Sequence, residues 1–386
     1  MIGWEDVHTV VVAVVPLYVA LILGYGSVRW WGIFTREQCD AINKLVCYFT
    51  FPLFTFEFTA HIDPFKMNFS FIAADTISKF IIVVVLALWA KCSSKGSYCW
   101  SITSFSLCTL TNALVVGVPI LKAMYGPLAV DLVVQSSVVQ AIIWLTLLLF
   151  VLEFRRTGIE GTRSSTLKPK PKTVIISSGS SRVMAGEGKD VEAATTTTSV
   201  AVVDVKDESM IIEDIDSSST RPPFWKLMKL VWLKLVVNPN SYGCVLGISW
   251  AFISNRWNLE MPSIVEGSIL IMSKAGTGTA MFSMGIFMAL QEKLVACGPS
   301  LTVFSLVLKF IAGPAAMAIS AIAVGLHGDV LRVAIIQAAV PQSITSFIYA
   351  KEYGLHPEVL STAVIFGMIV SLPVLVAYYA ILEFIH

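Results

Sequence analysis

The chain has 386 residues, of which 56% are hydrophobic and only 14% are Asp, Glu, Lys or Arg. A soluble protein carries about 25% charged residues, so this chain has too few to cover a water-facing surface and is expected to be a polytopic membrane protein. Its formal net charge of +1 argues against a nucleic-acid partner. The seven cysteines are scattered and form no CxxC pair, so neither a disulfide framework nor a metal site is expected.

Ten apolar runs follow one another along the chain. They cover residues 7–28, 41–59, 69–90, 100–121, 132–154, 240–255, 263–290, 298–325, 330–350 and 358–382. A bilayer core of about 30 Å needs roughly 20 residues of helix, so the predicted fold is all-α with ten transmembrane helices. The first run follows acidic rather than basic residues, so we expect a retained span and not a cleaved signal peptide.

A long polar segment separates the runs into two groups of five. It is rich in Ser and Thr and has almost no aromatic residues, so it is expected to be disordered. Three regions are therefore predicted: a first five-span repeat in residues 1–156, a loop in 157–223 and a second five-span repeat in 224–386.

Short sequence matches relate the two halves at nearly constant offsets of 227 to 230 residues. They are Arg29-Trp30 with Arg256-Trp257, Lys79-Phe80-Ile81 with Lys309-Phe310-Ile311, Tyr125-Gly126 with Tyr353-Gly354, and Leu152-Glu153-Phe154 with Leu382-Glu383-Phe384. Because each half has an odd number of spans, the second half enters the membrane with the opposite orientation. Inverted repeats of this kind are typical of secondary transporters.

Lys and Arg residues predict the orientation. They are more frequent in the loops after spans one, three, seven and nine than in the other short loops, and they flank the long polar segment. Cytosolic loops carry the excess of Lys and Arg, so the long loop is expected in the cytosol and both termini on the opposite side.

Spans four and nine are interrupted at matching positions. Span four contains Asn112, Gly117 and Pro119, and span nine contains Pro341 near its middle. Proline removes a backbone donor, and non-helical backbone at membrane depth is tolerated where it lines a cavity or is buried in protein. The matched pair predicts a substrate site at the bilayer midplane; a kinked packing helix in each span is the alternative.

Span three contains two charged residues on one helix face, Asp75 and Lys79, which are four residues apart. An unpaired charge at the bilayer centre costs about 2.5–3.5 kcal/mol, so we expect a salt bridge. It is either structural or exchanges partners when substrate or a proton arrives. Thr55 in span two and Gln140 in span five are expected to extend this polar cluster. Lys309 mirrors Lys79 but lacks an acidic residue four positions before it, which favours a packing role.

Enzyme signatures are missing from the sequence. It contains no HExxH, GxSxG or GxGxxG motif, and its five histidines are dispersed. The chain is therefore not expected to be an enzyme, nor to bind a cofactor.

Several segments resemble those of the plant PIN-FORMED auxin efflux carriers. They are Val15-Pro-Leu-Tyr-Val-Ala, Tyr25-Gly-Ser-Val-Arg-Trp-Trp, Phe71-Ile-Ala-Ala-Asp, Asn238-Pro-Asn-Ser-Tyr, Ala280-Met-Phe-Ser-Met-Gly, Ala350-Lys-Glu-Tyr-Gly-Leu-His-Pro and Leu360-Ser-Thr-Ala-Val-Ile-Phe-Gly-Met. The resemblance covers residues 1–156 and 224–386. Thr55-Phe56-Glu57-Phe58 is most similar to the short-loop subgroup of the endoplasmic reticulum.

The resemblance implies an elevator-type transporter in the lipid bilayer that is a homodimer through its scaffold helices. Spans 1, 2, 6 and 7 would form the scaffold, and the other six would form the moving transport domain. The implied substrate is indole-3-acetate or a similar aromatic carboxylate, bound where spans four and nine cross. Asn112 would hydrogen-bond the carboxylate, and Val115, Pro341 and Ile344 would line the crossing. The residues that match the family's supporting polar cluster are Thr55, Asp75, Lys79 and Gln140.

Three positions depart from the family pattern. Thr111 stands where the family has a proline, Leu145 replaces a usual tyrosine, and Lys274 stands where an aspartate is common. The predicted function is transport of the auxin anion between the cytosol and the lumen of the endoplasmic reticulum, with the plasma membrane as the alternative location. An ion-coupled organic-acid symporter and a membrane auxin receptor that moves nothing are the alternative functions.

Overall fold

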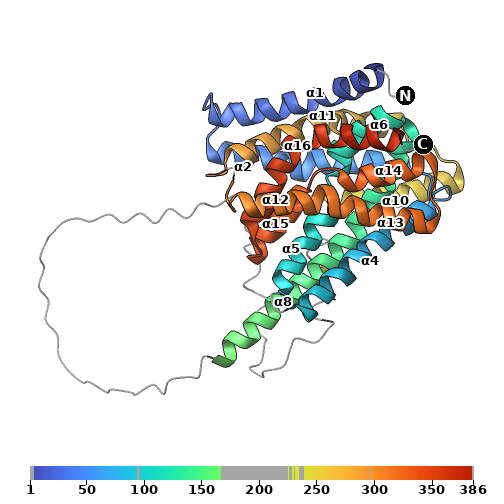
Figure 1. The fold of residues 1–386 in the computed structure, drawn as a ribbon. Coiled ribbons are helices and arrows are strands. Elements are labelled where there is room, and N and C mark those ends of the chain that lie inside the picture. The colour runs from blue at the N-terminus through green and yellow to red at the C-terminus, as the bar shows by residue number, and fades with distance from the viewer. Residues whose placement is uncertain are drawn as a thin grey trace, which may run out of the picture.

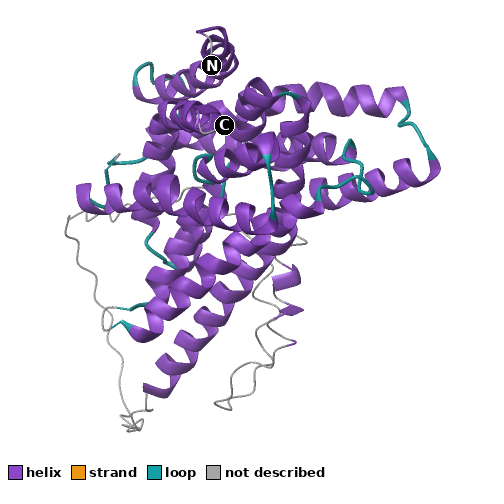
Figure 2. Ribbon diagram, turned by 45° about the vertical axis from the view of Figure 1, so that its right-hand side comes forward, coloured by secondary structure: helices purple, strands orange, loops and turns teal. Residues whose placement is uncertain are grey.

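The computed structural model describes residues 4–93, 96–166, 225, 228–229, 231–233, 239–293 and 295–384. Within these residues the regular structure is helical, apart from one isolated β-bridge (Figure 2). The predicted loop begins at residue 157, but helix α8 continues to Thr166. The rest of the predicted disordered loop lies outside the described residues.

The described residues of the first half form eight α-helices and three π-helical turns, labelled η. They are α1 (Trp4–Arg29), α2 (Arg36–Leu45), η1 (Val46–Thr50), α3 (Phe51–Ala60), α4 (Phe69–Cys92), α5 (Tyr98–Thr109), η2 (Ala113–Gly117), α6 (Val118–Tyr125), α7 (Pro127–Val139), η3 (Gln140–Trp144) and α8 (Leu145–Thr166). The described helices of the second half are α10 (Pro239–Trp257), α11 (Ser263–Ala289), α12 (Pro299–Val307), η5 (Leu308–Ala312), α13 (Gly313–Val324), α14 (Gly328–Ala339), α15 (Ile344–Tyr353) and α16 (Pro357–Phe384).

Five helical stretches within the described residues are long and apolar enough to cross a membrane. They are His8–Arg29, Phe69–Cys92, Pro127–Arg156, Pro299–Val324 and Pro357–Phe384. These correspond to the predicted spans one, three, five, eight and ten, so a helical membrane protein with several spans is confirmed. The other five predicted runs also fall on helices, which are shorter, interrupted or more polar. The complete ten-span inverted repeat stays a prediction.

Local sequence signals explain several helix ends. The side chain of Thr35 accepts a hydrogen bond from the backbone N–H of Gln38, and the Gln38 side chain accepts one from Thr35 N–H, which makes a capping box for α2. Asn68 caps α4 in a similar way, by accepting from Phe71 N–H. At the end of α15, Gly354 adopts a left-handed conformation that closes the helix and that glycine tolerates best.

Helices α1, α3, α10 and α11, called here the glycine-contact group, pack closely through glycines. A Cβ atom on Gly24 would lie 2.0 Å from the backbone oxygen of Phe282, and one on Gly285 would lie 2.0 Å from that of Leu21. These contacts join α1 to α11, which run side by side in Figure 1. Gly243 makes a similar contact between α10 and α3. Small residues let helix backbones approach where lipid provides no hydrophobic driving force.

Helices α4 to α8 and α12 to α16, with the π-turns between them, form the crossing group. Helix α4 packs on α13, α13 on α14, and α16 covers α12, α14 and α15. In the first half, α6 packs on α7. The group encloses the breaks in spans four and nine, and it therefore holds nearly all of the predicted site residues.

The turn between α15 and α16 carries a half-buried histidine. The ring of His356 stacks on Trp100 with centroids 4.1 Å apart, and its Nδ1 lies 3.0 Å from Thr103 Oγ1. Because the Thr103 hydroxyl donates to the carbonyl of Cys99, Nδ1 carries the proton that joins His356 to Thr103. Burial lowers the pKa of His356, and the nearby Arg155 lowers this pKa further. The stack joins α5 to the start of α16.

Candidate functional site

Spans four and nine cross as two extended segments rather than as helices. Thr111 and Gln342 form an isolated antiparallel bridge. On either side of it, Asn112 N donates to Pro341 O at 2.8 Å and Ser343 N donates to Leu110 O at 3.3 Å. The two breaks predicted from sequence therefore meet, and each supplies backbone partners to the other.

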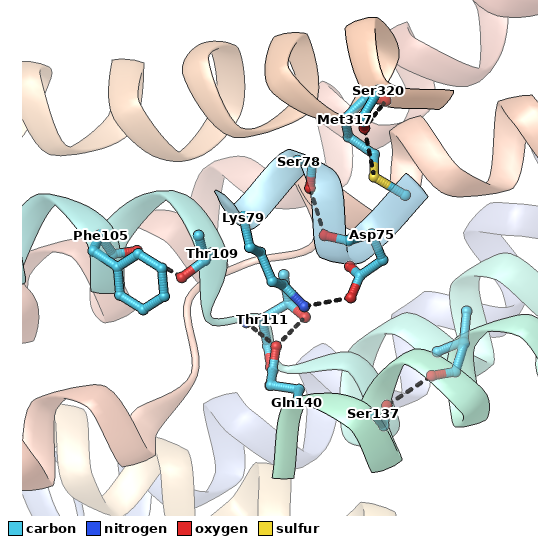
Figure 3. Close-up of polar contacts among 11 residues, drawn as sticks. Asp75, Ser78, Lys79, Phe105, Thr109, Thr111, Ser137, Gln140, Met317 and Ser320 are labelled. Carbon is cyan, nitrogen blue, oxygen red and sulfur yellow. Dashed lines mark hydrogen bonds and ion pairs between the residues drawn. The ribbon is translucent and has the colours of Figure 1, made fainter. Parts of the chain in front are cut away.

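Gln140 completes the hydrogen bonding of the crossing. Its Oε1 accepts from the N–H of Thr111 at 3.1 Å and from the Thr111 hydroxyl at 3.3 Å, while its Nε2 donates to the Thr111 carbonyl at 2.9 Å (Figure 3). Backbone groups at membrane depth need such partners because water is absent. The side-chain amide of Gln140 thus replaces the helical hydrogen bonds that the break removes.

Gln342 does the same on the side of span nine. Its Nε2 donates to the carbonyl of Ser106 at 2.9 Å and to the hydroxyl of Ser346 at 2.7 Å. The first bond ties the break in span nine to the end of α5, and the second ties it to the first turn of α15. Gln342 is fully buried, so these bonds hold the extended segment inside the crossing group.

The four predicted substrate-binding residues lie on these two segments. Asn112 directly precedes η2 and is half-buried, and in the described part of the chain its side-chain amide makes no hydrogen bond. Val115 and Pro341 are buried, whereas Ile344 is half-buried at the start of α15. Helices begin directly after Asn112 and Ser343, so two positive helix ends lie at the crossing. The arrangement offers an uncharged amide donor beside apolar walls.

Asp75 and Lys79 form the expected salt bridge. Lys79 Nζ lies 2.6 Å from Asp75 Oδ2, and both side chains are at least nine-tenths buried (Figure 3). The ammonium also lies 5.6 Å from the ring centroid of Trp144, a cation–π contact that the sequence did not indicate. A cavity of about 20 Å³ adjoins the pair, with room for about one water.

The other two residues of the predicted polar cluster come from other elements, Gln140 from η3 and Thr55 from α3. Gln140 bonds Thr111 at the crossing, as described above. Thr55 is buried on α3 in the glycine-contact group, where its carbonyl accepts a hydrogen bond from Thr59. It is not among the residues that line the cavity beside Asp75.

Three residues at or near the crossing were given no site role from sequence. Gln342 and Gln337 are both buried amides in span nine, and Gln337 lines the cavity beside Asp75. Lys309 donates to the carbonyl of Leu110. Two glutamines close to a mid-span proline could have indicated these roles from sequence, because side-chain amides can satisfy the backbone groups that a broken helix exposes. In the described residues no three His, Cys, Asp or Glu side chains gather as metal ligands.

Residues 9–379 match the protein family described as membrane transport protein. The chain is 68% identical to auxin efflux carrier component 5 of Arabidopsis thaliana over 386 residues, which is the full length of both chains. It is 59% identical to probable auxin efflux carrier component 5a of Oryza sativa subsp. japonica, again over the full length of both. Auxin efflux carrier component 8 of Arabidopsis thaliana is 39% identical, with 99% of this chain and all of the relative covered. The chain therefore belongs to the membrane transport protein family that contains the auxin efflux carriers.

Proposed function

We propose that this protein transports auxin, the indole-3-acetate anion, across a membrane. Two relatives that match it over their whole length are named auxin efflux carrier and probable auxin efflux carrier components. The observation that carries the proposal is the Asn112 amide, which lies at the crossing without a hydrogen bond from the described part of the chain. An auxin anion combines a carboxylate with a flat aromatic ring, so it needs hydrogen-bond donors at one end and an apolar surface at the other.

Binding uses the uncharged polarity of the crossing. Asn112 donates to the carboxylate, and the positive ends of the η2–α6 and α15 helices stabilise its charge. Val115, Pro341 and Ile344 contact the ring. Because none of these four residues carries a fixed charge, the anion is held firmly enough to bind and weakly enough to leave.

The polar residues around the crossing keep it open. The Gln140 amide holds Thr111 in an extended conformation, although Thr111 lacks the fixed backbone torsion that the family's proline would give. The buried Asp75–Lys79 pair lies beside the same segment, since the cavity that these two residues line also touches Thr111. Gln140 and the Asp75–Lys79 pair act as supporting groups in this proposal and do not contact the substrate.

Transport proceeds by an elevator movement of the crossing group against the glycine-contact group. The close backbone contacts of Gly24 and Gly285 favour a rigid unit of α1 and α11. All four proposed substrate-binding residues belong to the other group, so a shift of that group carries the site across the membrane. The broken spans four and nine in corresponding halves support an inverted repeat.

The scaffold of this transporter is proposed to form a homodimer through α11. Along one face of this helix, Ile264 is 83% and Ile271 72% exposed, and nothing within 4 Å would meet a Cβ atom on Gly267 or Gly278. Lys274 lies exposed on the same face. A charged side chain that faced only lipid at this position would be costly. These five positions are alternately three and four residues apart, which is the heptad spacing of paired helices, and small residues favour close helix pairing. Disulfide cross-linking of Ile271→Cys in membranes, with native cysteines replaced, tests the contact; monomers only would contradict it.

The endoplasmic reticulum is proposed as the location, with both termini in the lumen and the long loop in the cytosol. The short-loop resemblance and the Lys and Arg distribution support it. Tags at either terminus should resist protease added from the cytosolic side, whereas a tag near residue 190 should be cut. The reverse pattern would contradict the orientation.

Uptake of labelled indole-3-acetate into vesicles containing the purified protein tests the function. Wild-type protein should accumulate label above protein-free vesicles without an imposed sodium or proton gradient. Uptake that requires such a gradient would identify an ion-coupled symporter instead. Saturable binding without uptake would identify a receptor.

A further inference from the structure

Lys309 is a buried cation with no carboxylate partner in the described part of the chain. It is 1% exposed and lies in the π-turn η5. The residue four positions before it is Ser305, whose hydroxyl donates to the carbonyl of Thr302. The equivalent position before Lys79 is Asp75, which forms the 2.6 Å ion pair. Within the described residues, therefore, Lys79 has a carboxylate partner and Lys309 has none.

The hydrogen bond of Lys309 leads directly to the crossing. Its Nζ donates to the carbonyl of Leu110 at 3.4 Å. Leu110 ends the half-helix α5, so this carbonyl belongs to the negative end of the helix dipole. The same carbonyl accepts from Ser343 N, and Leu110 lies two residues before Asn112. Lys309 thus shares its acceptor on one crossing segment with the backbone N–H of Ser343 on the other.

The charges close to the crossing are therefore unequal. Asp75 balances Lys79, and the ammonium form of Lys309 adds a further positive charge that a single backbone carbonyl offsets only in part. An unbalanced cation in a buried, apolar environment is costly. A substrate that brings one negative charge to Asn112 would remove this imbalance, whereas an uncharged substrate of the same shape would not.

We propose that Lys309 sets the preference for the anionic over the uncharged form of an aromatic substrate, by supplying the positive charge that the bound carboxylate balances. This rests on the proposed function, because it concerns the ligand bound at the crossing. Lys309 is a positioning residue: it acts through the end of α5 and does not touch the substrate. The consequence is that the loaded crossing group is closer to electrical neutrality than the empty one when it moves.

The test compares two ligands of nearly equal shape, indole-3-acetate and the uncharged indole-3-acetamide, on purified full-length protein. Lys309→Gln removes the charge and retains a donor for Leu110. It should weaken indole-3-acetate binding about tenfold, the effect of one charge acting over several ångströms through protein, and change indole-3-acetamide binding less than twofold. Lys309→Arg should retain the wild-type preference. An equal loss for both ligands would mean that Lys309 only holds the backbone, and would overturn the proposal.

A second variant answers the same question with Lys309 in place. Ser305→Asp supplies a carboxylate four residues before the lysine, as Asp75 does for Lys79, and should also reduce the preference for the anion about tenfold. Ser305→Asn is the matched control of the same size and should behave as wild type. If Ser305→Asp retains the wild-type ratio of the two affinities, or if Ser305→Asn loses it equally, the proposal fails. Wild-type protein that binds neither ligand would contradict the proposed function as well.

Discussion

Substitution of Asn112 by alanine tests the substrate site most directly. In the described residues its side-chain amide bonds no protein group. Its backbone N–H and C=O keep their bonds to Pro341 and to the first turn of η2 whatever the side chain is. Asn112→Ala therefore removes the proposed ligand contact and leaves the crossing intact, so we expect little change in thermal stability.

The expected loss of affinity follows from the charge of the ligand. A hydrogen bond to a charged group contributes about 1.5–3 kcal/mol, which corresponds to a loss of roughly 12- to 140-fold in the dissociation constant for indole-3-acetate. Uncharged indole-3-acetamide should lose less, because its hydrogen bond is weaker. Asn112→Asp keeps the shape and adds a negative charge, so at pH 7 it should bind indole-3-acetate more weakly than Asn112→Ala does.

The assay is equilibrium binding of both ligands to purified protein, with vesicle uptake measured on the same preparations. Thermal unfolding provides the control for folding, since all three proteins should melt within a few degrees of one another. Wild-type affinity and uptake in Asn112→Ala would place the carboxylate elsewhere and contradict the proposed site. A large fall in melting temperature would show instead that the side chain supports the fold.

Three further perturbations concern two groups that support the proposed site and the stacked histidine His356. Asp75→Asn leaves the buried charge of Lys79 unpaired and should destabilise the protein by about 3–5 kcal/mol, measured as a lower melting temperature with impaired uptake. Gln140→Leu leaves the N–H and C=O of Thr111 unpaired and should lower the free energy of unfolding by about 2–6 kcal/mol. An unchanged melting temperature would contradict the role of Gln140 in holding Thr111. The lowered pKa of His356 means that the folded state binds fewer protons than the unfolded state, so its contribution to stability should be present above the unfolded pKa of about 6.5 and lost as the pH falls from there through the lower pKa of the folded state. His356→Gln should remove this part of the pH dependence of unfolding.

The sequence predicted those features of the site that depend on neighbouring residues. The Asp75–Lys79 ion pair is local, because residues four apart share a helix face wherever the helix lies. The breaks at Asn112 and Pro341 were predictable for the same reason, since helix-breaking residues act on their own segment. Apolar runs of sufficient length likewise predicted which segments would be helical.

Contacts between distant segments were not predictable in this way. Gln140 reaches Thr111 across 29 residues, and Lys309 reaches Leu110 across 199. Both polar residues lie in π-turns, η3 and η5, which change the direction in which side chains leave the helix. No residue pattern in these segments indicates an inserted turn, and π-turns are often found at functional sites. Helical periodicity alone therefore assigns such side chains to the wrong neighbours.

Lys309 shows most clearly why a contact between distant segments cannot be predicted from sequence. Lys79 has a carboxylate four residues before it, whereas Lys309 has Ser305 at that position, so the sequence alone predicts a packing role for Lys309. The structure gives the lysine an acceptor that has no sequence signature, because every residue has a carbonyl and only a broken helix leaves one available at this depth. The same break that exposes Leu110 O creates the extended segment carrying Asn112. One interruption of span four therefore accounts for both the proposed binding segment and the carbonyl that accepts the hydrogen bond of Lys309.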